Sequence, residues 1–158
     1  MTDYLPLFAP EFGGSFPPPR PWQDAAHESL REGARNGHRC QMVMAPTAAG
    51  KTYLAMRIIH EALLRHKRAM FVCDRKTLIN QTSSVASDYG LSSHGIIQAQ
   101  NPRMDVRKHF QIGSLQTLAM RGWPETDVVI VDEAHTQYKT WRDYIKNHSE
   151  ARVIGLSA

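Results

Sequence analysis

The sequence predicts an α/β domain, in which a mostly parallel central sheet of about six strands has helices on both faces. Short apolar segments alternate along the chain with segments whose apolar residues recur at helical spacing, as in βαβ units. The β-branched run at residues 128–131 is typical of a strand buried on both faces. A length of 158 residues suits one domain with a full core and is too short for two ordinary ones.

Residues 1–21 form a separate segment that is rich in proline and phenylalanine. Proline at this density disfavours a helix and favours an extended path, so we expect an arm laid over the domain surface. A ligand for an SH3-type module is the alternative. From Trp22 the pattern becomes helical, with Ala26, Leu30 and Ala34 on one face and a stop signal after residue 35. The folded domain is therefore expected to span residues 22–158.

The remaining elements follow in order. Further helices are expected at residues 52–66, 76–89 and near 114–120, because apolar residues there recur at helical spacing. Strands are expected where short apolar runs occur, at residues 41–45, 69–73, 94–98, 110–113, 128–131 and 153–156.

The segment A-P-T-A-A-G-K-T at residues 45–52 has the character of a phosphate-binding loop between a strand and a helix. Small residues let the backbone wrap around phosphate oxygens, and Gly50 leaves room where the helix begins. Lys51 would place its ammonium on the β- and γ-phosphates, and the Thr52 hydroxyl would bind magnesium. Ala45 and Ala48 stand where glycine is common. Ala48 fits without strain if its φ is negative, whereas a left-handed conformation would cost about 1–2 kcal/mol.

The segment V-D-E-A-H at residues 131–135 places an acidic pair directly after a buried strand. Ligands of open α/β sheets bind at the carboxyl edge, where the phosphate loop must also lie. Asp132 would hold magnesium, partly through water, and Glu133 would orient or deprotonate the attacking water. Together the two segments predict hydrolysis of a nucleoside triphosphate, with ATP and Mg²⁺ as the ligands. A lone histidine such as His135 is commonly a surface or capping residue.

The composition limits the partners and the cellular locations that are compatible with this sequence. A net charge of +4 permits a polyanionic partner without requiring one. No apolar run approaches the roughly 20 residues that span a bilayer, and the N-terminus lacks a signal-peptide pattern, so no membrane partner and a cytoplasmic location are expected. Cys40 and Cys73 lie beside expected buried strands and are interpreted as reduced core thiols.

The two segments together resemble motifs I and II of superfamily 2 helicases and translocases of the DEAH-box kind, whose motif I commonly begins with alanine. Other segments resemble further motifs of this family in order: R-P-W-Q at 20–23, F-V-C-D-R-K-T-L-I-N-Q at 71–81, G-S-L-Q-T-L at 113–118 and G-L-S-A at 155–158. The second of these is similar to motif Ia of the branch with the motor subunits of type I and type III restriction enzymes. The last resembles the start of motif III.

The resemblance implies a RecA-like lobe, the first of two, cut inside motif III and without its second lobe. It implies that strand 153–156 inserts between the strands that precede the two motifs. By the same resemblance Arg20 and Gln23 recognise adenine, His135 and Ser157 couple hydrolysis to movement, and the loop residues Pro46, Thr47, Ala48, Ala49, Gly50, Lys51 and Thr52 hold the phosphates. The residues implied to lie toward a nucleic-acid backbone are Arg75, Lys76, Ser114, Gln116 and Thr117.

For these last residues a purely structural role is the alternative to nucleic-acid binding. Arg75 and Lys76 would then be solvated surface charges, and Ser114 would cap a helix. Three functions are compatible with the sequence. The first is the motor lobe of an ATP-dependent helicase or translocase, with DNA favoured over RNA by the restriction-type motif Ia. The others are a self-contained P-loop phosphotransferase and a nucleotide-binding module without motor activity. As a motor lobe alone, the chain should hydrolyse ATP poorly, because the second lobe supplies the arginine fingers.

Overall fold

All six strands run parallel in one sheet, with the order β1-β6-β5-β2-β4-β3. The structure is a computed structural model that describes residues 15–136 and 138–158. The strands are β1 (Cys40–Met44), β2 (Ala69–Cys73), β3 (Gly95–Ile97), β4 (Phe110–Ser114), β5 (Val128–Val131) and β6 (Arg152–Ser157). The predicted α/β class and number of strands are thus confirmed, and the insertion of the last strand between β1 and β5 is confirmed as well.

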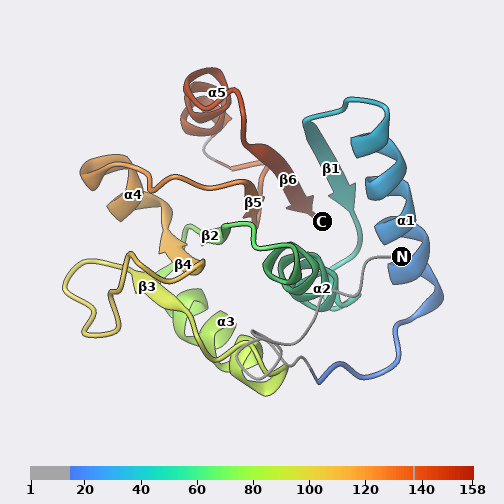
Figure 1. Cartoon of the computed structure of the whole chain (residues 1–158), viewed down its shortest axis with the longest axis horizontal. Coiled ribbons are helices and arrows are strands. Elements are labelled where there is room, and N and C mark those ends of the chain that lie inside the picture. Colours follow the sequence, from blue (N-terminus) through green and yellow to red (C-terminus); the bar gives the residue numbers. More distant parts are fainter. Residues whose placement is uncertain (1–14, 137) are drawn as a thin grey trace.

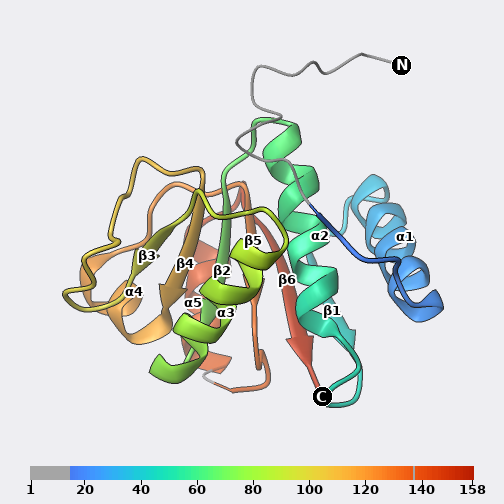
Figure 2. The same cartoon turned by 90° about the horizontal axis from the view of Figure 1, so that it is seen from below.

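Helices cover both faces of the sheet (Figure 1). One face packs against α1 (Pro21–Arg35), α2 (Lys51–Leu64) and α3 (Lys76–Asp88), and the other against α4 (Leu115–Arg121) and α5 (Tyr138–Asn147). Successive strand residues alternate between these two cores, so Phe71 faces α1–α3 while Met70 and Val72 face the opposite layer. Figure 2 shows the strands side by side with α2 and α3 in front of them and α5 behind. The helices thus bury both faces of the sheet and leave its carboxyl edge to the loops.

Helix α5 is the element that the sequence analysis omits. Its buried residues Trp141 and Tyr144 are three apart, with the partly buried Ile145 beside them, so the apolar stripe is narrow and the other described positions are polar or charged. The stripe is completed from outside the helix by Trp123, whose ring lies 4.5 Å from that of Tyr144 and 5.6 Å from that of Trp141. Periodicity within one segment could not reveal a partner that comes from another loop.

The expectation that both cysteines are core thiols is wrong for Cys40. Cys73 is buried, and burial raises the pKa of its thiol to about 12. Cys40 is exposed, as are Met42 (55% exposed) and Met44 (73% exposed) on the same face of β1. Strand β1 lies at the edge of the sheet, where its only neighbour among the described strands is β6.

The predicted N-terminal arm falls largely on residues 1–14, which lie outside the described residues. The described part, residues 15–20, lies over α2 and α3. Phe16 stacks on Tyr89 with ring centroids 5.1 Å apart and meets the edge of Tyr53. The amide of Ser15 donates to the carbonyl of Tyr89 (2.9 Å), and the Tyr53 hydroxyl donates to the carbonyl of Pro17. Helix α1 begins at Pro21, a position at which proline is favoured because its missing N–H would be unpaired.

No helix among the described residues is long and apolar enough to cross a membrane.

Glu61 of α2 contacts two side chains of α1, His27 and Arg31, and also Arg65 at the end of its own helix. Its carboxylate lies 2.8 Å from His27 Nε2, 3.1 Å from Arg31 and 2.9 Å from Arg65. The hydrogen bond with His27 is the largest cause that lowers the pKa of Glu61 from 4.5 to about 2, with Arg31 adding to it. Glu61 therefore stays ionised in the folded chain at pH values at which the unfolded chain protonates it.

We expect this pKa shift to make stability depend on acid. The contribution of Glu61 is fully present above pH 4.5 and is lost as the pH falls through about 2, because the unfolded chain binds the proton first. Glu61→Gln should lower the free energy of unfolding at pH 7 by about 1–3 kcal/mol and flatten its decline between pH 5 and 3, as urea titrations at each pH would measure. The matched control is Glu32→Gln, which removes an exposed carboxylate of α1 that does not contact Glu61 or its partners. An equally steep decline in the Glu61 variant would contradict this assignment.

Candidate active site

The register of three adjacent strands gathers the predicted site at the carboxyl edge of the sheet. Met44 of β1 pairs with Ser157 of β6, and Val131 of β5 pairs with Gly155 of β6. The loop after β1 and the acidic pair after β5 therefore flank the end of β6. Two backbone bonds fasten this junction, from Ala45 N to Ser157 O (3.0 Å) and from Ala134 N to Leu156 O (2.9 Å).

The loop at residues 45–50 is built as an anion site. Gly50, with φ of 96°, is the N-cap of α2, and no side chain caps that helix. The first N–H groups of α2 are therefore available to an anion, which the helix dipole also favours. Lys51 at the first position of α2 folds back over the loop, where its ammonium donates to the carbonyls of Ala45 (2.7 Å) and Pro46 (3.4 Å). Helix α2 begins one residue before the predicted start, and β1 ends one residue before its predicted end.

Ala48 does not adopt the negative φ that would avoid strain, since its φ is 63°. Glu133 of the acidic pair is also left-handed, with φ of 52°. An alanine held in this region costs about 1–2 kcal/mol relative to its preferred conformations. Backbone strain of this kind persists only where the surrounding structure enforces it, and here it marks both segments of the candidate site.

Ala48→Gly is therefore expected to stabilise the folded chain, by up to about 1 kcal/mol, since glycine removes the left-handed strain but gains more freedom on unfolding. The measurement is a urea unfolding titration. The matched control is Ala25→Gly, at an exposed position of α1 where the backbone is right-handed. This change should destabilise the folded chain by about 1 kcal/mol. Equal losses in the two variants would show that residue 48 is not left-handed in solution.

The R-P-W-Q segment holds the phosphate loop by its carbonyl groups. Arg20 Nη1 donates to Ala49 O (2.9 Å), and Gln23 Nε2 donates to Gly50 O (3.0 Å). Gln23 is only 4% exposed, and its Oε1 accepts from Arg20 N at 2.7 Å. Both ends of the Gln23 amide are therefore bound to this chain. In this structure the R-P-W-Q segment therefore stabilises the conformation of the phosphate loop.

Trp22 is a site residue that the sequence analysis misses. Its indole N–H donates to Ala49 O at 3.0 Å, so Ala49 O accepts from both Trp22 and Arg20. The signal in the sequence was a tryptophan beside the loop-binding residues, because a half-buried indole N–H requires an acceptor. Trp22 also lines a cavity of about 460 Å³ beside the loop, together with Arg20, Met44 and Pro46.

The acidic pair is linked to the end of β6 through His135. Asp132 is half-buried, and burial, with the neighbouring Glu133 charge second, raises the pKa of Asp132. The amide of Glu133 donates to Asp132 Oδ1 at 3.0 Å. His135 Nε2 lies 3.3 Å from Glu133 Oε2, and its Nδ1 is hydrogen-bonded to Ser157 Oγ at 2.9 Å. The predicted coupling residues therefore contact each other and the predicted base.

A cavity of about 310 Å³ adjoins the acidic pair. It is lined by Cys73, Asp74, Arg75, Leu78, Asp132, Glu133, His135 and Thr136. Arg75 is the N-cap of α3 and is exposed. The structure thus brings the end of β2 to the same edge as the acidic pair, so one of the residues predicted to face nucleic acid lies next to the predicted catalytic group.

The five residues predicted to face nucleic acid divide into two groups. Arg75, Lys76 and Gln116 are exposed. Ser114 is 2% exposed, and Thr117 is buried, with its hydroxyl accepting from the amide of Ala99 at 3.1 Å. Ser114 occupies the N-cap of α4 without a side-chain hydrogen bond to that helix. The side chains of Ser114 and Thr117 are therefore not at the surface of this structure.

Solved structures that are similar to this chain include a helicase, an ATPase core and a restriction-modification enzyme. The chain is similar to the UvsW helicase from bacteriophage T4, with a TM-score of 0.73 and 18% identity over 88% of this chain and 52% of that one. It is also similar to a Sulfolobus solfataricus SWI2/SNF2 ATPase core in complex with dsDNA (TM-score 0.69, 14% identity, 87% and 31% covered). A third is the Type ISP restriction-modification enzyme LlaGI in complex with a DNA substrate mimic (0.66, 15%, 90% and 17%).

These likenesses establish the RecA-like fold, and the chain spans about half or less of the length of each of these proteins. No curated protein matches the sequence. The family model described as "Type III restriction enzyme, res subunit" matches residues 16–158, which is nearly the whole chain. The chain therefore belongs to the family of the type III restriction enzyme res subunit, and its domain is a RecA-like lobe of the helicase type.

Proposed function

We propose that the chain is the ATP-binding motor lobe of an ATP-dependent DNA helicase or translocase, which couples ATP hydrolysis to movement on nucleic acid. The observation that carries this proposal is the contact of His135 with both Ser157 and Glu133. A phosphate loop and an acidic pair suffice for nucleotide hydrolysis. A histidine that ties the acidic pair to the end of the intervening strand supplies a path from hydrolysis to movement.

The residues of the loop fit a triphosphate. The uncapped first turn of α2 offers N–H donors, and Gly50 keeps the approach open. Lys51 would exchange its bonds to Ala45 and Pro46 for bonds to phosphate oxygens, since a charged donor prefers an anionic acceptor over a neutral carbonyl. Pro46, Thr47, Ala48 and Ala49 would complete the cradle around the phosphates.

Thr52 and Asp132 would hold the magnesium ion. When bound, the ion neutralises charge on the phosphates and helps to position them. The raised pKa of Asp132, caused by burial and by Glu133, fits a carboxylate that is placed to receive a cation. Glu133 would orient and deprotonate the attacking water. His135 would hold Glu133 in place and would connect it to Ser157 through its other ring nitrogen.

The base of the nucleotide would enter the cavity beside the loop that Arg20 and Trp22 line. The guanidinium and indole offer flat surfaces for a purine. Gln23 would recognise adenine only if its amide exchanged at least one of its present partners, Gly50 O or Arg20 N. In this proposal adenine binding at Gln23 would therefore also change the hydrogen bonds that hold the phosphate loop.

On the nucleic-acid side we assign the exposed residues Arg75, Lys76 and Gln116 to the phosphate backbone, contacts that position a strand without reading its sequence. DNA is favoured over RNA by the restriction-type family and by the DNA in two of the similar structures. A second RecA-like lobe is the expected partner in the complete active site. We place the protein in the cytoplasm.

The test is a titration of the 158-residue chain with Mg-ATP, with and without single-stranded DNA, for wild type and Glu133→Gln. The proposal expects DNA to strengthen ATP binding and Glu133→Gln to leave binding intact, because Glu133 acts on water. Phosphate transfer to a small acceptor would instead indicate a phosphotransferase, and nucleotide binding that is indifferent to DNA would indicate a binding module. Turnover by this chain alone should be very slow, and a fast DNA-stimulated rate abolished by Lys51→Ala would contradict that.

A further inference from the structure

A second cavity, of about 420 Å³, lies at the amino edge of the sheet. Its lining comes from α1, the second half of α2 and residues at or just before the starts of strands, such as Arg39, Asp127 and Arg152. The amino ends of parallel strands share one edge, so this cavity faces away from the phosphate loop and the acidic pair. Nothing in the proposed nucleotide chemistry uses it.

The floor of the cavity is aliphatic. Helix α1 contributes Leu30 and Ala34, helix α2 contributes Ile58 and Ala62, and Ile154 lies beneath on β6. The two alanines leave space that larger side chains would fill. The hollow is therefore large enough to accept an aliphatic or aromatic side chain from outside.

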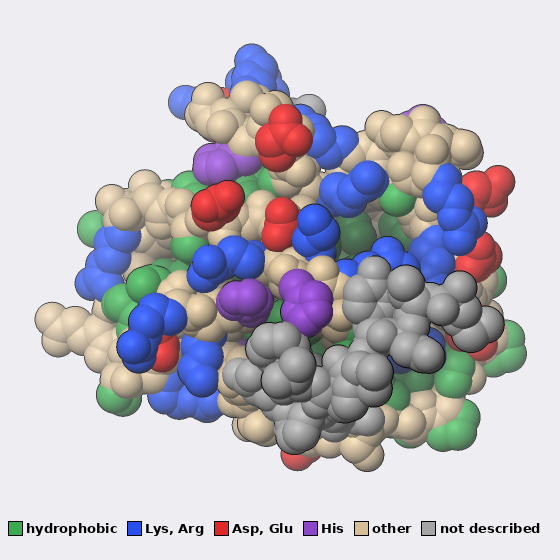
Figure 3. Space-filling view, in the orientation of Figure 1, with side chains coloured by type: hydrophobic (Ala, Val, Ile, Leu, Met, Phe, Trp, Pro, Cys, Tyr) green, Lys and Arg blue, Asp and Glu red, His purple; other side chains and the backbone are tan. Residues whose placement is uncertain are grey.

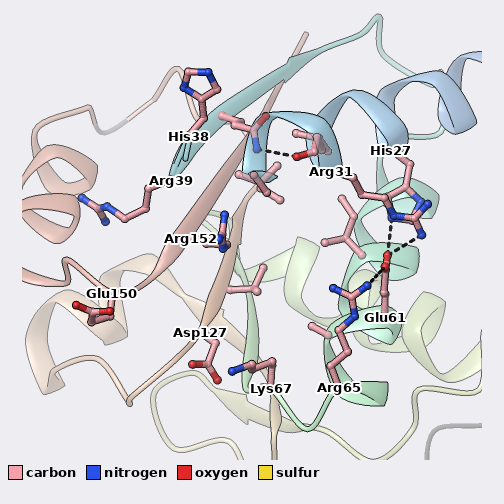
Figure 4. A pocket seen from close by; sticks show the side chains of 17 residues that line it. His27, Arg31, His38, Arg39, Glu61, Arg65, Lys67, Asp127, Glu150 and Arg152 are labelled. Atoms are coloured by element: carbon pink, nitrogen blue, oxygen red, sulfur yellow. Dashed lines mark hydrogen bonds and ion pairs between the residues drawn. The ribbon is translucent and has the colours of Figure 1, made fainter. Parts of the chain in front are cut away.

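Most charged side chains around the rim are already bound. Glu61 holds Arg31 and Arg65. Arg39 turns away toward α5, where its guanidinium donates to the carbonyls of Ile145, His148 and Ala151 at 2.9–3.0 Å. Figure 4 shows these groups around the cavity, with Arg152 between Arg39 and the side chains that surround Glu61.

Two cations on the rim remain. The side chains of Lys67 and Arg152 are exposed and form no hydrogen bond or ion pair with any residue in 15–136 or 138–158. Of the two acids nearby, Asp127 accepts from the amide of Arg68 at 2.8 Å, and Glu150 is exposed. Two such cations beside the aliphatic side chains offer a ligand one apolar contact and two charged contacts at once.

We propose that this cavity is a docking site for an acidic peptide segment of a partner protein. One aliphatic or aromatic side chain of the segment enters between α1 and α2, and flanking carboxylates bind Lys67 and Arg152. An apolar anchor in a pocket with charges around it is the usual anatomy of such an interface. Charge complementarity makes the partner acidic.

A nucleic-acid strand fits the same surface poorly. Glu61, Asp127 and Glu150 lie between the cations of the rim. Separate carboxylates of a peptide can bind Lys67 and Arg152 and avoid these acids, whereas the evenly spaced phosphates of a continuous strand cannot. Figure 3 shows acidic and basic side chains interspersed over the face that it presents, in place of an unbroken basic track. Among the described residues that line the cavity there is also no phenylalanine, tyrosine or tryptophan, and these are the side chains on which bases of a single strand stack best.

The test measures binding of the 158-residue chain to a panel of blocked hexapeptides. Each carries one leucine or phenylalanine flanked by none, two or four aspartates, and backbone-amide NMR locates the contact. We expect affinity to rise with the number of aspartates, to fall when the apolar residue becomes glycine, and to weaken at high salt. Amide shifts should centre on Ala34, Ala62 and Arg152.

Charge reversal supplies the matched comparison. Lys67→Glu and Arg152→Glu should each weaken the best peptide about tenfold, while Arg142→Glu, an exposed cation of α5 that does not line the cavity, should leave it unchanged. Unaltered Mg-ATP binding by all three would show that they fold. Peptide binding that ignores the two reversals, no binding by any peptide at millimolar concentration, or displacement of the peptide by oligo-dT at this cavity would each overturn the proposal.

Discussion

Lys51→Ala is expected to weaken Mg-ATP binding by the chain about 100-fold, which corresponds to about 2.7 kcal/mol. The ammonium of Lys51 is already held inside the loop, 2.7 Å from Ala45 O, so little side-chain entropy remains to be lost when phosphates replace the carbonyls. Charge-assisted bonds of this kind contribute about 1.5–3 kcal/mol each. Isothermal titration calorimetry with Mg-ATP measures the loss directly.

The control for this prediction is Lys139→Ala, which removes an exposed lysine on α5 and keeps the net charge equal to that of the Lys51 variant. The two variants therefore differ only in where the charge is lost. If both bind Mg-ATP within threefold of the wild type, the phosphates do not lie at residues 45–52, and the proposed function fails with them.

Phe71→Ala is expected to lower the free energy of unfolding by about 3–5 kcal/mol, because the cavity it leaves cannot collapse within a regular sheet. Phe71 is 1% exposed at the middle of β2, where it pairs with Ile112 of β4 on one side and Ile130 of β5 on the other. Urea unfolding followed by circular dichroism measures the change. A loss of this size is a large part of the total stability of a domain of this length.

Phe16→Ala is the matched control, since it removes the same side chain from a partly buried position over α2 and α3. Its loss should be smaller, about 1–2 kcal/mol, because less apolar surface returns to water. Equal losses in the two variants would mean that the arm contributes as much as the centre of the sheet, contrary to the burial of β2.

The parts of this protein that the sequence predicts well are those whose causes are local. An apolar run followed by small residues and Gly-Lys-Thr fixes a strand, a loop and a helix N-terminus within a dozen positions. The β-branched run at residues 128–131 likewise has no reasonable alternative to a buried strand. For this reason β2 and β5 match their predicted bounds, and the other elements that were predicted differ by one or two residues.

The features that the sequence did not predict depend on contacts between distant segments. Helix α5 depends on Trp123 from another loop, the exposure of Cys40 depends on which strand is at the edge, and the role of Trp22 depends on a carbonyl 27 residues away. In each case the deciding contact joins segments far apart in the chain, and a pattern read along one segment cannot contain it.

By itself the sequence determined the α/β class, the phosphate loop, the acidic pair and the resemblance that predicted where the last strand inserts, because each follows from residue types at short fixed spacings. Only the tertiary structure decided that Ala48 and Glu133 are left-handed, that His135 joins Glu133 to Ser157, and that Lys67 and Arg152 lie unpaired above an aliphatic hollow. Those features arise where several strands and loops meet. The packing of the whole sheet decides which segments meet there, and no single segment does.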